Sequence, residues 1–436
     1  MAARDLTMEM EALMPAGAVE ALRALGRVAD GRGATSLVVG GVVRDILLGK
    51  AALDLDVVVS EPAAEFGRAA AAALGGAVKA VTRFGTALLV LPGGLKVDLA
   101  TARSESYERP GALPTVADGT LADDLLRRDF TLNALAVVIN ARDFGTLVDH
   151  HGGLADLERG VLRVLTDRSF EDDPTRVLRA VRLSARLGFT LDGRTEELLV
   201  RAVADGCLGT VTGERILNEI VLILSERDPW PPVERLRDWG VLRGIDESWT
   251  DTPPRSAFSE ISRALRPAAG ESAAPDAEPW VAFFASLLTA VPPEGRGRIL
   301  ARLAAPGRAR RATRDAAALE ELAAGRLAAP DGPRRSEVRR LLAPFSPEAL
   351  VAAMALRPGS EAGRRIGLFL SELRHVGTCL RGADVEALGV PRGPSVGRVL
   401  AALLDARLDG VVTSRTEEEA LARRLARDLD TGNNVC

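Results

Sequence analysis

The sequence predicts an α+β fold, in which a sheet-bearing N-terminal part precedes an all-helical remainder. Short β-branched runs alternate with helical patterns over residues 37–148, whereas nearly every pattern beyond residue 190 is helical. The 436 residues are too many for one hydrophobic core, so we expect roughly two to four domains. Charged residues make up 27% and hydrophobic residues 47% of the chain, which is typical of a globular protein.

Composition also narrows the possible function classes. No apolar run reaches the roughly 18–20 residues of a membrane span, and the N-terminus lacks an export pattern, so we expect a cytoplasmic protein with no membrane partner. Cys207, Cys379 and Cys436 are too scattered for a disulfide framework. The 3 histidines are too few for a His-based metal cluster. A net charge of −4 gives no indication that the chain binds nucleic acid, although arginines are concentrated in residues 296–314.

The elements of the N-terminal part follow one another in a clear order. Predicted helices cover residues 19–28 and 63–74, and predicted strands cover residues 37–39, 53–59, 77–81, 86–91 and 96–100. Residues 101–122 contain glycine, two prolines and little periodicity, so we expect a long, mobile functional loop. Residues 137–147 complete the predicted sheet.

A tight turn after the first strand is the first candidate for chemistry. Gly40 and Gly41 allow the backbone to turn sharply, and residues 42–48 then predict a short helix. The backbone N–H groups left free at such a helix start form a natural phosphate cradle. Arg44 lies in the first turn of this helix and adds a positive charge. The pattern therefore favours a phosphate-binding turn.

Two carboxylates follow on the next predicted strand. Asp54 and Asp56 are two residues apart, so on a strand they share one face. Like charges this close are costly unless a cation lies between them, and oxygen ligands suit Mg²⁺. Asp98, on the strand at residues 96–100, is either a third carboxylate beside them or a strand-end residue making a turn. An isolated Asp-x-Asp is usually a solvated strand end, but the preceding glycine turn and Arg44 favour a metal–triphosphate site.

Residues 124–136 form a second candidate segment. Arg127 and Arg128 supply two adjacent guanidinium groups, and one of them must point toward the fold. Asp129 is able to cap a turn, and Asn133 is able to bond the backbone.

The most regular basic element is a predicted helix that ends at Gly188. Asp173 is its expected N-cap and Pro174 its first helical residue. Four arginines share one face of this helix: Arg176, Arg179, Arg182 and Arg186. They lack acids at i+4 and repel one another, so we expect a bound anion or nucleotide to compensate them. The alternative is a solvated basic face.

Asp173 and Arg176 also suggest how a base is selected. Cytosine and adenine each present an exocyclic amine donor beside a ring-nitrogen acceptor, whereas uracil and guanine present the reverse order. An aspartate accepts from the amine while an arginine donates to the ring nitrogen. One rigid pair would therefore accept C and A and refuse U and G.

The remainder of the chain is predicted to be helical. The expected helices cover residues 194–204, 213–225, 232–239, 280–289, 296–304, 309–324, 337–342, 347–355 and 396–406. Residues 266–279 are rich in Pro and Ala and predict a loop or linker.

Three ordered motifs resemble those of the class II tRNA nucleotidyltransferase and bacterial poly(A) polymerase family. They are Gly-Gly-Val-Val-Arg-Asp-Ile-Leu-Leu-Gly at residues 40–49 followed by Asp54-x-Asp56, Arg-Arg-Asp-Phe-Thr-Leu-Asn-Ala-Leu-Ala at 127–136, and Asp-Asp-Pro-Thr-Arg-Val-Leu-Arg-Ala-Val-Arg at 172–182. The resemblance covers about residues 35–225. Asp172 is a departure, because many family members have glutamate there.

The resemblance implies a polymerase-β-like head with a mixed sheet, followed by helical neck, body and tail domains that hold tRNA. The corresponding boundaries are residues 1–160, 161–228, 229–360 and 361–436. It implies that Asp54 and Asp56 bind metal. Asp98, if its strand lies beside theirs, is a candidate third catalytic carboxylate. It further implies that the nucleotide is bound by Gly40, Gly41, Arg44, Arg128, Asp173, Arg176, Arg179 and Arg182.

The implied activity is transfer of CMP and AMP from CTP and ATP to a tRNA 3′ end, which completes CCA and releases pyrophosphate. Two Mg²⁺ ions would assist, and the protein would be a monomer or homodimer. CC-only addition, A-only addition and poly(A) synthesis share the motifs, and the loop at 101–122 is a candidate for deciding among them. Two functions of different classes compete with these: a non-catalytic RNA-binding protein, and a nucleotidyltransferase acting on a small molecule or protein.

Overall fold

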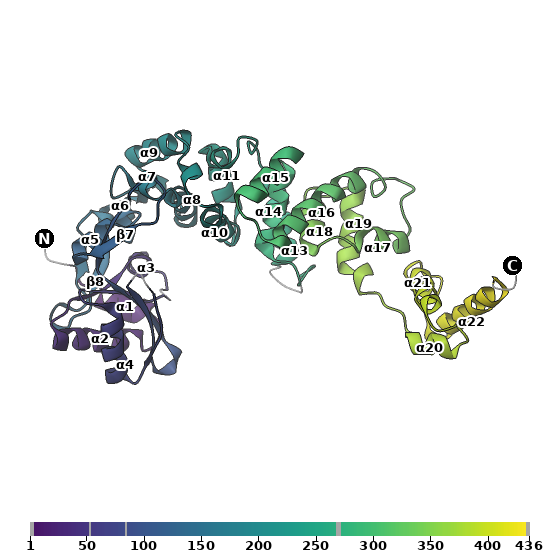
Figure 1. Cartoon of the computed structure of the whole chain (residues 1–436), viewed down its shortest axis with the longest axis horizontal. Coiled ribbons are helices and arrows are strands. Elements are labelled where there is room, and N and C mark those ends of the chain that lie inside the picture. Colours follow the sequence, from purple (N-terminus) through teal and green to yellow (C-terminus); the bar gives the residue numbers. More distant parts are fainter. Residues whose placement is uncertain (1–3, 52–53, 83–84, 267–271, 433–436) are drawn as a thin grey trace. The chain divides into compact units, whose positions relative to one another are not determined.

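The computed structural model describes residues 4–51, 54–82, 85–266 and 272–432 (Figure 1). The chain forms two compact units. One consists of Met1–Glu219 and Asp238–Ile245, and the other of Ile220–Arg237 and Asp246–Cys436. The division into four domains stays a prediction.

The first unit is built on a 7-stranded sheet with the order β3-β4-β5-β2-β1-β8-β9. Its strands are β1 (Ser36–Val39), β2 (Asp56–Val59), β3 (Ala77–Val81), β4 (Thr86–Val90), β5 (Lys96–Thr101), β8 (Ala136–Val138) and β9 (Leu147–Val148). The sheet is mixed, because β2 and β5 run parallel while β1 is antiparallel to both β2 and β8. The predicted α+β class with a mixed-sheet head is confirmed.

Side chains of β1 alternate between two hydrophobic clusters, as expected for a strand buried on both faces. Val38 joins the larger cluster, which the sheet shares with α1 (Thr7–Leu13), α2 (Ala18–Arg32), α3 (Gly41–Leu47) and α4 (Ala63–Leu74). Leu37 and Val39 join the smaller cluster together with Leu125 of α5 (Leu121–Leu126). The ends of β1 and β2 that carry the candidate residues are thereby fixed by buried apolar contacts.

Two predictions for this unit need correction. The strand expected at residues 53–59 begins only at Asp56, so Asp54 precedes it and Leu53 lies outside the described residues. The expected loop at residues 101–122 contains a two-stranded hairpin, β6 (Arg103–Ser106) paired with β7 (Thr115–Asp118), and the start of α5. The hairpin sequences are polar and short, so they lack the apolar alternation that identifies strands.

Further elements complete the first unit. They are α6 (Gly153–Arg159), β10 (Val161–Leu162), α7 (Ser169–Asp172), α8 (Thr175–Leu187), β11 (Thr190–Leu191), α9 (Gly193–Ala204) and α12 (Val241–Ile245). Short 3₁₀ turns lie at Pro92–Gly94, Thr131–Asn133, Ala141–Asp143 and Cys207–Thr210. Helix α8 starts one residue later than predicted, with Pro174 at its N-cap, although Pro174 already has helical dihedral angles (φ −60°, ψ −17°).

The second unit is helical. After α10 (Gly213–Leu224) come α11 (Trp230–Asp238), α13 (Arg255–Leu265), α14 (Pro279–Thr289), α15 (Pro293–Arg302), α16 (Gly307–Ala324), α17 (Arg335–Leu342), α18 (Pro347–Ala355), α19 (Glu361–Ser371), a 3₁₀ turn (Leu373–His375), α20 (Gly382–Ala387), α21 (Pro394–Leu408) and α22 (Arg415–Gly432). Helix α14 has no charged residue and is buried almost all round. Of the predicted linker, residues 267–271 lie outside the described residues. Within the described ranges, no helix combines the length and the apolar character needed to cross a membrane.

The arginines crowded at residues 296–314 find acids elsewhere in this unit. Arg298 pairs with Asp246 at 2.9 Å, and Arg308 pairs with Glu348 at 2.6 Å. Arg296 lies 3.3 Å from Glu320. The cluster looked uncompensated because its acidic partners lie outside the stretch.

Candidate nucleotide-binding and catalytic site

A cavity of about 590 Å³ in the first unit collects most of the predicted site residues. Its walls come from the turn after β1, the start of β2, the hairpin, the segment around Arg128, helix α8 and helix α10. The predicted residues that line it are Gly40, Gly41, Arg44, Asp56, Arg128, Asp173, Arg176, Arg179 and Arg182. Asp54 and Asp98 are not among its lining residues.

The glycine turn is held in a conformation that favours glycine. Gly40 has φ +78°, and a Cβ atom there would lie 3.0 Å from Nη1 of Arg128. Helix α3 begins at Gly41, and its Arg44 is buried, with 6% of its surface exposed. Arg44 donates through Nη1 to Oδ1 of Asn133 at 2.7 Å and through Nε to Asp45 at 2.9 Å. The turn therefore presents backbone and a fixed cation to the cavity.

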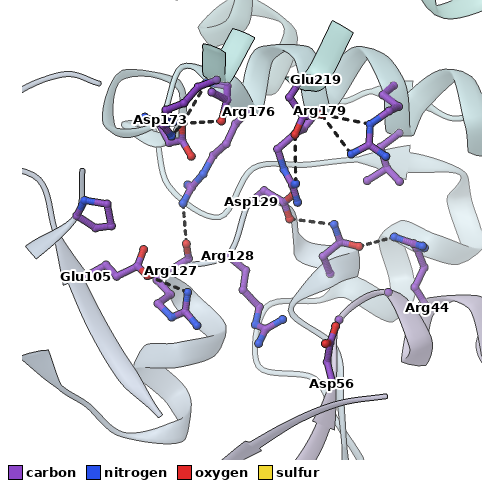
Figure 2. Close-up of a pocket in the computed structure, with 18 of the residues that line it drawn as sticks. Arg44, Asp56, Glu105, Arg127, Arg128, Asp129, Asp173, Arg176, Arg179 and Glu219 are labelled. Carbon is purple, nitrogen blue, oxygen red and sulfur yellow. Dashed lines mark hydrogen bonds and ion pairs between the residues drawn. The ribbon is translucent and has the colours of Figure 1, made fainter. Parts of the chain in front are cut away.

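Two of the predicted carboxylates lie on neighbouring central strands of the sheet. Asp56 opens β2, and its register partner on the parallel strand β5 is Asp98. Both side chains keep exposed surface. The pKa of Asp56 is raised, first by partial loss of hydration and next by the negative charge of Asp98, with a smaller effect of Asp54. Arg128, which extends toward Asp56 in Figure 2, opposes this shift.

This donor set fits a hard divalent cation, because a cation relieves the repulsion between carboxylates that raises the pKa of Asp56. Across the part of the chain that the structure describes, no group of three or more His, Cys, Asp or Glu side chains is placed to hold a metal ion. Two carboxylates would therefore need further oxygen ligands from substrate or water.

The two adjacent arginines share one buried acid. Asp124, which is fully buried, accepts hydrogen bonds from Arg127 at 2.6 Å and from Arg128 at 2.9 Å. Both arginines line the cavity, so both point toward the fold. The Nε atom of Arg128 is buried and has no hydrogen-bond partner among the described residues. Arg128 therefore has one donor that no described residue satisfies.

Asp129 links the head to the arginine-bearing helix, and sequence reasoning missed this role. Its Oδ2 atom accepts from Nε and Nη2 of Arg179, and its Oδ1 atom accepts from Nδ2 of Asn133 at 2.9 Å. Because Asn133 also bonds Arg44, a continuous chain of hydrogen bonds joins Arg44 to Arg179 (Figure 2). Burial alone would raise the pKa of Asp129, but the charge of Arg179 and the bond from Asn133 hold it below its usual value.

Protein acids also compensate much of the arginine stripe on α8. Glu219 of α10 lies 3.6 Å from Arg179 and 3.3 Å from Arg182. Acids from distant segments therefore compensate both arginines within the protein, and contact of these arginines with a nucleotide stays a prediction. Arg186 is exposed at the cavity and forms no ion pair with any residue that the structure describes.

Asp173 and Arg176 lie on the same wall of the cavity. Oδ1 of Asp173 accepts from the backbone and hydroxyl of Thr175 and from Nη2 of Arg215 at 2.8 Å. Its Oδ2 atom has no hydrogen-bond partner within the described ranges and is available to an incoming group. Arg176, with 8% of its surface exposed, is fixed by donating to Oγ of Ser169 and to the carbonyl oxygen of Arg127.

Several further lining residues were not predicted: Glu105, Tyr107, Arg215 and Glu219. Arg215 and Glu219 lie four residues apart on α10, which is the spacing of one helix face. That spacing gave a weak signal, but their partners lie outside α10: Asp173 lies between α7 and α8, and Arg182 lies on α8.

Comparisons with known proteins identify the family. The poly(A) polymerase head domain matches residues 36–163. The CC-adding tRNA nucleotidyltransferase of Deinococcus radiodurans is 36% identical over 392 residues, covering 88% of this chain and 88% of that protein. The chain belongs to the tRNA nucleotidyltransferase family. The resemblance seen in the motifs is thereby confirmed.

Other relatives support this assignment. A solved structure of a CCA-adding enzyme in an apo form has a TM-score of 0.82 and 30% identity, covering 99% of this chain and 100% of that one. The A-adding tRNA nucleotidyltransferase of Geobacter sulfurreducens is 39% identical over 97% of this chain. The chain spans only about half (49%) of that relative's length. Divalent metal dependence is general in this family.

Proposed function

We propose that this chain adds C and A to the 3′ end of tRNA, using CTP and ATP and releasing pyrophosphate. The observation that carries the proposal is one cavity lined by the glycine turn, Asp56 and the pair Asp173–Arg176. Template-independent nucleotide addition needs three features in one place: backbone N–H groups that bind phosphate, a carboxylate that binds metal, and side chains that recognise the edge of the base. The glycine turn, Asp56 and the pair Asp173–Arg176 supply these features. A Thermotoga maritima CCA-adding enzyme complexed with tRNA, at TM-score 0.79 and 30% identity, supports tRNA as the acceptor.

Base selection follows from the fixed positions of the reading pair. The free Oδ2 atom of Asp173 accepts a hydrogen bond from the exocyclic amine of cytosine or adenine. An N–H group of Arg176 that is not bonded to Ser169 or to the Arg127 carbonyl donates to the adjacent ring nitrogen. Uracil and guanine would leave this acceptor facing an acceptor and the donor facing a donor. Asp173 and Arg176 are held by other protein groups, so they cannot rotate to form hydrogen bonds with uracil or guanine. These two bases are therefore rejected.

The triphosphate is proposed to lie at Gly40, Gly41, Arg44 and Arg128. Asp56 and Asp54 are the proposed ligands of Mg²⁺, and Asp98, the register partner of Asp56, is a candidate third catalytic carboxylate. Bound Mg²⁺ supplies activation of the tRNA 3′-hydroxyl and neutralises charge on the triphosphate. Arg128, placed against Asp56, orients the nucleotide.

Addition of A alone is the second candidate. The A-adding enzymes of Geobacter sulfurreducens, Aquifex aeolicus and Halalkalibacterium halodurans are 39%, 48% and 38% identical to this chain over the matched regions. The base-reading pair by itself accepts both C and A, so it does not separate the two functions.

We propose that the helical neck, body and tail domains hold the tRNA. We also propose that the protein acts in the cytoplasm.

The deciding experiment is incorporation of labelled CTP or ATP into two tRNA transcripts. One transcript lacks the whole CCA end, and the other already ends in CC. Full CCA addition predicts C and A on the first transcript and A on the second. A-only addition predicts labelling of the second transcript alone. Failure to label either, under conditions where the tRNA is bound, would contradict the proposed activity.

A further inference from the structure

Tyr107 is the only tyrosine in the sequence, and the proposed reaction leaves it without a role. It follows strand β6 of the hairpin and lines the cavity together with Asp173 and Arg176. It is the single aromatic side chain among the described residues that line this cavity. It also borders a smaller cavity of about 250 Å³ that it shares with Arg127 and Arg176.

The tyrosine ring is held firmly in place. Its hydroxyl donates to Oε2 of Glu105 at 3.1 Å. The other oxygen of that carboxylate accepts from Arg103 at 2.7 Å and from Arg127 at 3.0 Å, and the Glu105 side chain is only 6% exposed. An anchored aromatic ring loses little conformational freedom when a ligand packs on it.

The ring also lies near the base-reading pair. Burial, together with the charge of Glu105, raises the pKa of Tyr107 to about 12, and the charges of Arg176 and Asp173 act on the same hydroxyl. The hydroxyl therefore stays protonated at working pH, and it remains committed to Glu105. The face of the ring, rather than its polar tip, is what the residue has left to offer a ligand.

We propose that the Tyr107 ring stacks on the base of the incoming nucleotide while Asp173 and Arg176 read the edge of that base. In-plane hydrogen bonds leave both faces of a base uncovered, and aromatic stacking accepts any base because each has a π-face. Tyr107 would thus add affinity for C and A alike, and selectivity would stay with the pair. This inference rests on the proposed nucleotide-adding function.

Kinetics of substituted proteins give the first test. Tyr107→Leu should raise KM for ATP and CTP about tenfold, while the preference for C and A over U and G stays unchanged. Tyr107→Phe keeps the ring and should recover most of the lost affinity. Leu113→Ala is the matched control, because Leu113 lies in the same hairpin loop, is 63% exposed and does not line the cavity.

The single tyrosine permits a direct test on the otherwise unaltered chain. Incorporated 3-fluorotyrosine gives one ¹⁹F resonance, which should shift on addition of CTP or ATP without tRNA. A shift that appears only with tRNA would overturn the proposal, because the ring would then contact the primer end. An active enzyme with neither a shift nor a KM effect would overturn it while leaving the proposed function intact. A shift with CTP in a protein that labels no tRNA would support the stacking and refute the function.

Discussion

The carboxylate of Asp129 accepts two hydrogen bonds from the guanidinium of Arg179, from Nε at 2.9 Å and from Nη2 at 2.5 Å. The two residues are 50 positions apart in the sequence. Asp129 lines the cavity together with the glycine turn, and Arg179 lies on helix α8, which also carries Arg176. The contact therefore ties the part of the site that would hold the triphosphate to the part that would choose the base.

Removing the charge of Asp129 should damage both stability and selection. We expect Asp129→Asn to lower the free energy of unfolding by about 1–3 kcal/mol, because it weakens a charged hydrogen-bonded pair with one buried member. Arg179 would then be held by Glu219 alone. Urea denaturation measures the stability, and incorporation of UTP and GTP measures the selection. Asp118→Asn is the control, since Asp118 is an exposed residue at the end of strand β7.

The same pair predicts a pH dependence with a definite sign. The pKa of Asp129 is lower in the folded protein than its usual value of about 3.9, so the folded state binds its proton less tightly than the unfolded state. The stability from this group is therefore complete above about pH 5, and it is lost as the pH falls through the lowered folded pKa. The stability difference between the native chain and Asp129→Asn should be constant from neutral pH to about pH 5 and shrink in stronger acid. If the difference in the free energy of unfolding between the two proteins grew as the pH fell, this prediction would be contradicted.

Asp98 can be assigned by its effect on metal requirement. If Asp98 belongs to the metal-binding carboxylates, Asp98→Asn should raise the Mg²⁺ concentration needed for half-maximal activity by roughly 10- to 100-fold. Asp98 lies inside strand β5 and pairs with both β2 and β4, so it makes no strand-end turn. If its carboxylate has no part in metal binding, the Mg²⁺ requirement should not move. Asp56→Asn should abolish incorporation while tRNA binding, measured by filter retention, stays close to that of the native chain. Loss of tRNA binding in Asp56→Asn would point to misfolding instead.

The glycine turn gives a test with a matched control in the same unit. Gly40→Ala places a Cβ atom 3.0 Å from Arg128 in a left-handed backbone conformation, so we expect a loss of at least about 1 kcal/mol in stability and a higher KM for both nucleotides. Gly31→Ala lies within helix α2, where a Cβ atom meets nothing within 4 Å. That substitution should be neutral or slightly stabilising. Equal effects of the two substitutions would contradict a special role for Gly40.

Local patterns predicted most of the head. Helix α4 and strand β3 have the expected bounds, because alanine-rich and β-branched runs show their periodicity within a few residues. The hairpin was missed because Arg103 and Glu105 point to polar partners and not to a hydrophobic core. Its strands therefore carry no apolar signature.

Pairings between distant segments were beyond local reasoning. The arginines of α8 have no acids four residues further along their own helix, and this spacing is what the local sequence shows. Glu219 and Asp129 reach them from other elements, and only the fold shows this. The position of Asp173 and Arg176 in one cavity with the glycine turn followed from the motifs, but the immobilisation of both by Arg215 and Ser169 did not.

The central claim is that Asp173 and Arg176 choose the base, and one ratio tests it most directly. On a tRNA ending in CC, kcat/KM for ATP divided by kcat/KM for GTP should be large in the native chain. It should fall by roughly 10- to 100-fold in Asp173→Asn, whose amide replaces a pure acceptor with a group that can also donate. An Asp173→Asn protein that remains folded and keeps the native ratio would contradict the account.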